Sequence, residues 1–193
     1  SSRCCSFVSF AFGRTPSVMV CAADLFSVRV AEASDVPEID MVLQASYSVL
    51  LKGAYEDEVL QAFLPHIIKC EPELLDNKTF FVVTHEPSKI IVACGGWSQA
   101  RVGTEEVTEG LGHLRQFAVH PDWAGKGLGK RLFEACQMQA MDVKVLDFEC
   151  CSSLLAEGFY QRLGLHTIGD KEVHVKEGIP PIACKLMKTR TQR

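Results

Sequence analysis

The segment that most constrains the fold is a predicted strand, a glycine-rich turn and a helix in direct succession, over residues 113–140 (HLRQFAVHPDWAGKGLGKRLFEACQMQA). The short apolar run 114–119 is typical of a buried strand. His120-Pro121-Asp122 ends it, because proline donates no hydrogen bond to a sheet ladder. From 130 to 140, apolar residues then recur at helical spacing.

The turn itself contains three glycines two residues apart, Gly125, Gly127 and Gly129. Glycine adopts positive φ readily and lets a ligand approach the backbone closely. A turn of this kind leaves unpaired N–H groups at the positive end of a helix dipole, which favours an anion, above all a phosphate. The turn therefore predicts a phosphate-binding site.

Two other phosphate-binding loops have a different spacing. The Rossmann fingerprint is G-x-G-x-x-G, and here the third glycine comes one residue too early. The Walker loop is G-x-x-x-x-G-K-[ST], but Gly129-Lys130 is followed by Arg131, and Ala124 holds the place of the first glycine. A tight strand–helix connection without a ligand is the remaining alternative.

The turn resembles the coenzyme A loop of the GCN5-related N-acetyltransferases, the GNAT family. Their motif is [Q/R]-x-x-G-x-G/A after a strand that usually ends in V-x-P, and this chain has V-H-P at 119–121 and A-G-K-G-L-G at 124–129. Ala124 departs from the motif, because alanine has no side chain to contact the pyrophosphate. The resemblance implies that acetyl-CoA, as co-substrate, is bound by Ala124, Gly125, Lys126, Gly127, Leu128, Gly129 and Lys130, with Arg131 adding charge.

A second motif lies about thirty residues after the first, as in the family. The run 156–165 (AEGFYQRLGL) resembles the family's N-x-x-A-x-x-F-Y-x-x-x-G-F, with matches at Ala156, Phe159, Tyr160 and Gly164. Ser153, which joins the predicted cofactor site, stands where asparagine is usual, and Leu165 replaces phenylalanine. The two motifs in this order extend the resemblance from about Ser27 to Lys188.

The resemblance implies an α/β (α+β) fold with a central mixed, mostly antiparallel sheet of about seven strands, a splayed parallel pair and about four flanking helices. The residue patterns predict strands over 26–31, 80–84, 90–97, 113–119, 143–150, 166–170 and 181–187. They predict helices from an N-cap at Ser34-Asp35 to Gly53, over 56–68 and 130–140, and over 154–163 with Ser152 or Ser153 as cap. Residues 98–111 are predicted to be a loop.

In the family, the strand before the loop is bulged and separates from the next parallel strand. A bulge leaves backbone groups unpaired, and the pantetheine arm takes them as an added strand would. By position, Phe117 and Val119, with Ala118 between them, are expected to contact the cofactor.

Acyl transfer from a thioester to an amine needs a deprotonated amine, a donor for the oxyanion and a proton for the leaving thiolate. The family motif makes Tyr160 the candidate acid; the alternative is a core tyrosine with a satisfied hydroxyl. His113, which shares a strand face with Arg115, and Glu149 on the next strand are the candidate bases. The alternative for His113 is a packed core histidine.

The two-helix region before residue 70 shapes the substrate mouth in many family members. Its polar candidates for the acceptor are Tyr47, Tyr55 and the acids Glu56, Asp57 and Glu58. For the acids, the alternative is a solvated helix N-terminus that complements the dipole.

Composition limits the remaining choices. A chain of 193 residues with 47% hydrophobic residues fits one domain, predicted over 25–193. A net charge of −4 argues against a nucleic-acid-binding surface, and no apolar run approaches the length needed to span a bilayer.

The composition of residues 1–24 suits an organelle transit peptide, a poor signal-peptide core or a cloning remnant before Met19. We expect an intracellular, cytoplasmic protein, imported into an organelle if the leader is native, and a monomer or homodimer.

The nine cysteines include no C-x-x-C pair, so we expect no metal site and no disulfide framework. Cys94, Cys136 and Cys184 lie among apolar neighbours, and Cys150 and Cys151 are interpreted as packing residues.

The resemblance favours an acetyl-CoA-dependent N-acetyltransferase that acts directly, in a ternary complex, on a small amine or a peptide amine. A CoA-binding regulatory module without turnover, and a transferase of another acyl group, are the alternatives.

Overall fold

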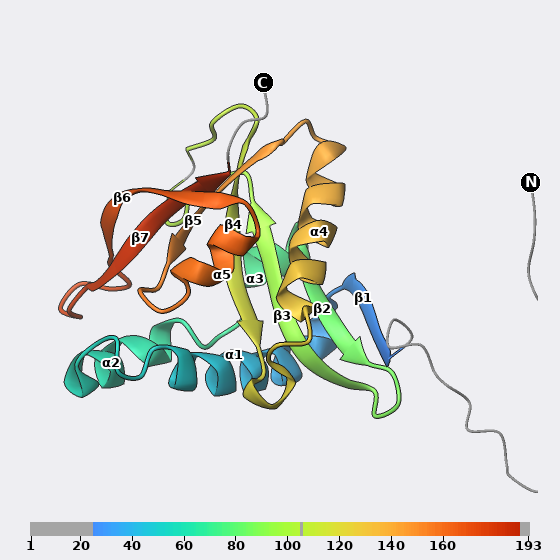
Figure 1. The fold of residues 1–193 in the computed structure, drawn as a ribbon, viewed down its shortest axis with the longest axis horizontal. Helices are drawn as coiled ribbons and strands as arrows, with labels where there is room; N and C mark the ends of the chain where they lie inside the picture. Colours follow the sequence, from blue (N-terminus) through green and yellow to red (C-terminus); the bar gives the residue numbers. More distant parts are fainter. Residues whose placement is uncertain (1–24, 105, 190–193) are drawn as a thin grey trace, which may run out of the picture.

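The computed structural model describes residues 25–104 and 106–189, and its centre is one seven-stranded sheet in the order β1-β2-β3-β4-β5-β7-β6 (Figure 1). The strands are β1 (Phe26–Val30), β2 (Phe80–His85), β3 (Ile90–Ser98), β4 (Leu111–Val119), β5 (Asp147–Ser152), β6 (Leu165–Val173) and β7 (Ile182–Thr189). The helices are α1 (Val36–Leu50), α2 (Asp57–Phe63), α3 (Pro72–Asp76), α4 (Leu128–Met141) and α5 (Glu157–Arg162), with short 3₁₀ turns at Ala33–Asp35, Leu64–His66 and Pro121–Trp123.

Within this sheet, β4 and β5 are parallel and the other neighbouring strands are antiparallel. The predicted fold class is therefore confirmed, with five α-helices among the described residues where about four were expected.

Helices cover both faces of the sheet. On one face, Leu132 and Phe133 of α4 pack with Phe81 and Val83 of β2. On the other face, α1 and α3 pack against the alternate residues of the same strand, such as Val82. Because successive strand residues point to opposite faces, β2 has to be apolar on both, which explains its FFVV sequence.

The parallel pair separates after three residues. Leu111, Gly112 and His113 pair with Asp147, Phe148 and Glu149, and no further pairing follows. The rest of β4 stays bonded to β3 alone. The splayed pair expected from the resemblance is thus present.

A bulge in β4 lies just beyond the point of separation. Its register with β3 shifts so that Gln116 and Phe117 together stand opposite Gly95, and Gln116 has a φ of +49°. A Cβ on Gly95 would lie 2.8 Å from the Phe117 ring, so the bulge requires glycine at this position.

Two predicted elements begin at the wrong residue. Strand β5 starts at Asp147 rather than at 143, because α4 is followed by a turn in which Lys144 has a φ of +61°. Helix α5 starts at Glu157 with Ala156 as N-cap. The predicted cap by Ser152 or Ser153 is wrong, since the Ser152 hydroxyl donates to the Ser153 carbonyl at 2.9 Å instead.

Other boundaries also differ. The predicted helix 56–68 ends as α-helix at Phe63 and continues as the 3₁₀ turn Leu64–His66, where Pro65 interrupts the helix. Helix α3 was not predicted, and β4 begins at Leu111, inside the predicted loop. Asp35 is the N-cap of α1 as expected, but its carboxylate binds Arg29 rather than the helix.

The predicted leader, residues 1–24, lies outside the described residues. Within the part that is described, none of the helices combines the length and the apolar character that a bilayer crossing demands.

Candidate active site

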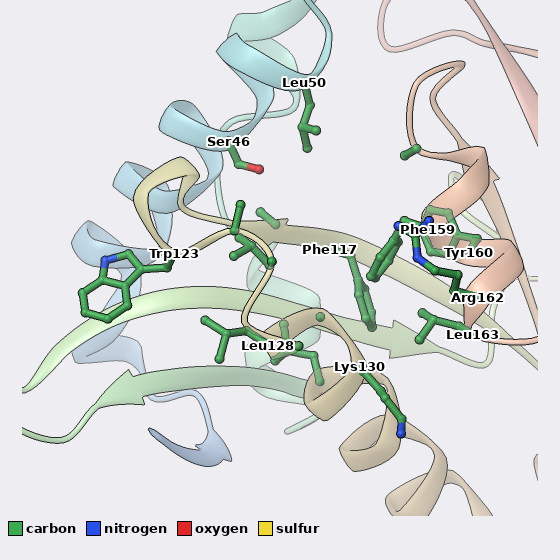
Figure 2. A pocket seen from close by; sticks show the side chains of 18 of the residues that line it. Ser46, Leu50, Phe117, Trp123, Leu128, Lys130, Phe159, Tyr160, Arg162 and Leu163 are labelled. Carbon is green, nitrogen blue, oxygen red and sulfur yellow. The ribbon is translucent and has the colours of Figure 1, made fainter. Parts of the chain in front are cut away.

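A cavity of about 800 Å³ lies beside the end of β4 that has no β5 partner (Figure 2). Its walls are the end of β4, the C-terminal half of α1, the glycine-rich turn with the start of α4, and α5. All of the predicted cofactor-binding residues except Lys126 and Ser153 line it, namely Phe117, Ala118, Val119, Ala124, Gly125, Gly127, Leu128, Gly129, Lys130 and Tyr160.

The glycine-rich turn exposes a row of main-chain donors. Gly125 and Gly127 have φ values of +76° and +75°, and Gly127 is the N-cap of α4, so no side chain caps the helix. Lys130 and Arg131 donate their N–H groups to the Gly127 carbonyl. Within the described residues, the N–H groups of 125–129 have no hydrogen-bond acceptor. Five consecutive free donors at a helix N-terminus form a site for an anion such as a diphosphate.

Gly129 serves a different purpose in the turn. A Cβ there would lie 2.7 Å from the ring of Phe159, so the start of α4 and α5 can touch only because residue 129 is glycine. This contact joins the two family motifs in space.

The positive charges around the turn are partly engaged elsewhere. Lys126 lies over the Trp123 ring, with Nζ 5.9 Å from the ring centroid. Lys130 forms an ion pair with Glu134 at 3.4 Å, and Arg131 donates to the carbonyl of Phe26 at 3.2 Å. The main-chain groups are therefore the principal anion ligands that the turn offers.

Tyr160 lies on the α5 wall of the cavity, with its ring 6.5 Å from that of Phe117 and 4.9 Å from that of Phe159. Among the described residues its hydroxyl has no hydrogen-bond partner. Burial raises the pKa of Tyr160 well above 10, so the phenol is protonated at neutral pH. A neutral, unpartnered phenol can donate a proton or a hydrogen bond to a group in the cavity.

His113 and Glu149 face each other at the last paired position of β4 and β5, with His113 Nδ1 3.9 Å from Glu149 Oε1. Both side chains are buried, and neither lines the cavity. Burial lowers the pKa of His113 below 6.5, against the opposing effect of the Glu149 carboxylate. The imidazole is therefore neutral at pH 7, as a general base must be.

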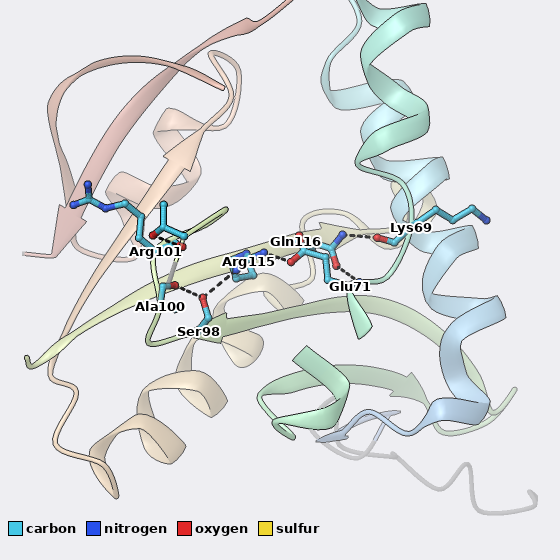
Figure 3. A network of polar contacts seen from close by, with 8 residues as sticks. Lys69, Glu71, Ser98, Ala100, Arg101, Arg115 and Gln116 are labelled. Atoms are coloured by element: carbon cyan, nitrogen blue, oxygen red, sulfur yellow. Dashed lines mark hydrogen bonds and ion pairs between the residues drawn. The ribbon is translucent and has the colours of Figure 1, made fainter. Parts of the chain in front are cut away.

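A polar network fixes the bulge next to this pair (Figure 3). The Arg115 guanidinium pairs with the Glu71 carboxylate and donates to the Ser98 hydroxyl at 3.1 Å. The Gln116 side chain accepts from the Glu71 N–H at 3.1 Å and donates to the Lys69 carbonyl at 2.6 Å. The segment before α3 thus holds the residue with positive φ in place.

The side chains that the sequence analysis proposed for acceptor binding have structural roles in the folded protein. Tyr47 packs against the α1 side of the core. The Tyr55 hydroxyl donates to the Ala183 carbonyl at 2.7 Å and accepts from the Leu154 N–H at 3.2 Å. The exposed acids Glu56, Asp57 and Glu58 stand at the start of α2, where they complement its dipole.

Sequence reasoning missed several lining residues. They come from α1, from the 3₁₀ turn after β4, and from α5 with its flanking residues, and are Ser46, Val49, Leu50, Pro121, Trp123, Leu155, Gly158, Arg162 and Leu163. Ser46 carried a signal, because it is a polar residue on the apolar face of its helix.

The six cysteines of the described residues are free. Cys94, Cys136, Cys150 and Cys184 are buried as predicted, but the interpretation of Cys151 as a packing residue is wrong, since it is exposed. A hydrogen bond from Cys184 lowers the pKa of Cys151 to about 7, with Lys171 acting in the same direction. In the described ranges, no cluster of three or more His, Cys, Asp or Glu side chains could hold a metal ion.

The fold is similar to that of solved acetyltransferases. The PaiA N-acetyltransferase of Thermoplasma acidophilum, crystallised with coenzyme A, has a TM-score of 0.63 at 12% identity over 86% of this chain and 98% of its own. A GCN5-related N-acetyltransferase of Rhodopseudomonas palustris has a TM-score of 0.67 at 17% identity, over 84% and 94%. A GNAT acetyltransferase of Brucella melitensis, solved with acetyl-CoA, has a TM-score of 0.51 at 20% identity, over 73% and 82%.

A search of curated protein sequences found no match. The sequence profile of the GNAT acetyltransferase domain, in contrast, matches residues 51–186, which is more than half of the chain. Together with the splayed strands and the glycine-rich turn, this match shows that the chain belongs to the GNAT family of acetyltransferases.

Proposed function

We propose that this protein transfers an acetyl group from acetyl-CoA to a primary amine, directly, in a ternary complex. The observation that carries the proposal is one continuous cavity with five free N–H donors at one end and the Tyr160 hydroxyl on its wall, beside an unpaired strand edge. Coenzyme A in the T. acidophilum structure and acetyl-CoA in the B. melitensis structure support the choice of cofactor. We assign this activity to a domain over residues 25–193.

The cofactor would lie along the cavity with its diphosphate on the N–H groups of residues 125–129. Its pantetheine arm would then run along the edge of β4 that faces β5, where β4 forms no pairing after His113. Phe117 and Val119 belong to the part of β4 that lines the cavity, so their main chain would contact the arm. The thioester is thereby brought to the point where the two strands separate.

At this point, the amine nitrogen attacks the thioester carbonyl, and the C–S bond breaks as the tetrahedral intermediate collapses. A main-chain N–H of β4 beyond His113, on the edge without a β5 partner, would donate to the oxyanion. Tyr160 gives its proton to the departing thiolate, and its nearness to Phe117 supports this role. His113 accepts the proton of the amine, with Glu149 orienting the imidazole.

The acceptor would approach from the face of the sheet opposite α4. On β4, Leu114 packs into the α4-side core, so its neighbours His113 and Arg115 face the other side. In this proposal, the base would lie on the sheet face opposite the helix whose N-terminal turn binds the diphosphate. Direct transfer between two bound substrates fits this arrangement, because no enzyme nucleophile has to move between them.

The decisive experiment is thiol release from acetyl-CoA with a panel of acceptors: polyamines, arylalkylamines, aminoglycosides and peptides with a free N-terminus. Release that depends on one acceptor class, with the acetylated product identified by mass, supports the proposal. Propionyl-CoA and succinyl-CoA in the same assay test whether another acyl group is preferred. Tight coenzyme A binding without release for any acceptor would instead support a regulatory CoA-binding module.

A further inference from the structure

Ser46 of α1 has a hydroxyl without a partner. Its side chain is 1% exposed, and its Oγ has no hydrogen bond within the described residues. Ser46 nevertheless lines the cavity, and Figure 2 shows the hydroxyl pointing into it from the α1 wall.

This orphan hydroxyl is unusual for its position. A serine within a helix ordinarily bonds the carbonyl one turn earlier or faces solvent, and Ser46 does neither. It stands on the face of α1 that also buries Ile39, Val42 and Leu43. A buried hydroxyl with no partner destabilises the fold, whereas alanine would pack there without that penalty. The missing partner is therefore expected to come with a ligand.

The place of Ser46 along the cavity indicates which part of the ligand it meets. Helix α1 packs against β4 and against the 3₁₀ turn Pro121–Trp123 that leads into the glycine-rich turn. Ser46 thus lines the same cavity as Phe117 and Tyr160 and as the residues of the glycine-rich turn. In coenzyme A, the part between the thiol and the diphosphate is the pantetheine arm, whose polar groups are two amides and a hydroxyl.

We propose that the Ser46 hydroxyl hydrogen-bonds an amide of the pantetheine arm, so that the arm is held between the main chain of β4 and the side chain of α1. The inference rests on the proposed function, because it places the cofactor in this cavity. A hydroxyl is both donor and acceptor and so suits either side of an amide. Leu50, one turn further on the same helix face, also lines the cavity.

The test compares two ligands on the full-length protein. Coenzyme A contains the pantetheine arm, and adenosine 3′,5′-bisphosphate lacks it. Isothermal titration of Ser46→Ala is expected to show about 2- to 10-fold weaker coenzyme A binding, as for one lost hydrogen bond, with unchanged affinity for the bisphosphate. Ser48→Ala, an exposed serine of the same helix, is the matched control and should change neither.

Thermal unfolding gives a second test, in which Ser46→Ala has opposite effects on the free and the coenzyme A-bound protein. Without ligand, Ser46→Ala should unfold at the same temperature as the wild type or higher, because the unpaired hydroxyl is gone. With saturating coenzyme A it should gain less stabilisation than the wild type.

Unchanged coenzyme A affinity in Ser46→Ala, or equal losses for both ligands, would overturn the role of Ser46. A raised KM for the acceptor with unaltered coenzyme A binding would also overturn this role, because it would show that Ser46 contacts the acceptor instead. If the wild type itself fails to bind coenzyme A, the proposed function fails first, and this result is distinct from all of the others.

Discussion

His113 and Glu149 form the last residue pair of two parallel strands, which separate from the next residue of each. Their facing atoms, Nδ1 and Oε1, are 3.9 Å apart and buried. This position joins the candidate base directly to the point where the strands separate. The position of this pair therefore leads to specific predictions about how the reaction rate depends on pH.

The acidic limb of the pH–rate profile is expected below pH 6.5. Burial lowers the pKa of His113, so the imidazole is neutral and active above its pKa and becomes protonated and inactive as the pH falls through it. His113→Ala should lower kcat by about 10²–10⁴-fold and remove this limb. The measurement is kcat/KM from pH 5 to 8 for the variant and the wild type.

The matched variant is Glu149→Gln. The Glu149 carboxylate raises the pKa of His113 relative to burial alone, so its removal should move the acidic limb to lower pH. If Glu149→Gln abolishes the limb while His113→Ala preserves it, the carboxylate is the base and the assignment to His113 is wrong.

Tyr160→Phe should reduce turnover by up to about 10²–10⁴-fold, because the thiolate would leave without a proton. Its hydroxyl has no partner among the described residues, so the variant breaks no internal hydrogen bond. Coenzyme A affinity and the unfolding temperature are expected to stay as in the wild type. Full turnover in Tyr160→Phe would remove the residue from the mechanism.

Gly129→Ala should destabilise the protein by about 1–3 kcal/mol through overpacking, since its Cβ would meet the Phe159 ring at 2.7 Å. Coenzyme A binding should weaken in parallel, because Phe159 and residue 129 are both part of the cavity wall. Gly169→Ala, where a Cβ meets no atom within 4 Å, is the control and should stay within about 0.5 kcal/mol. Equal unfolding free energies for the two variants would contradict the contact.

Cys151 is expected to react with iodoacetamide fastest among the cysteines of the described residues, with a rate that rises as the pH passes about 7. Peptide mapping by mass spectrometry compares it with Cys136 and Cys150, whose burial raises their pKa values. In Cys184→Ala the thiol that lowers the pKa of Cys151 is gone, and the midpoint should move toward 9. A midpoint that does not move would show that Cys184 is not the cause.

The sheet was predictable from the sequence because its elements depend on local patterns. The glycine spacing of 125–129 and the run 80–84 specify a turn and a strand without reference to the rest of the chain. The start of β5 was not predictable in this way. Val143 and Val145 suggest a strand, but both donate their N–H groups to the Ala140 carbonyl at the end of α4, which makes this segment a turn.

The parts of the site that sequence reasoning missed depend on contacts between distant residues. Ser46 reaches the cavity only because α1 packs across the end of β4. Arg115 was expected on the face of His113, but its partner Glu71 lies 44 positions earlier, in a segment with no periodic pattern. Cys151 is exposed between the buried Cys150 and Ser152 of β5, because successive strand residues point to opposite faces and its own face is not covered there.

The network around Gln116 has a consequence for how the cofactor enters. Lys69 and Glu71 hold the bulge from outside the sheet, and β4 forms no ladder bonds with β5 beyond His113. A cofactor arm that runs along this edge therefore breaks no strand pairing when it enters. Its association loses no free energy to the opening of a ladder.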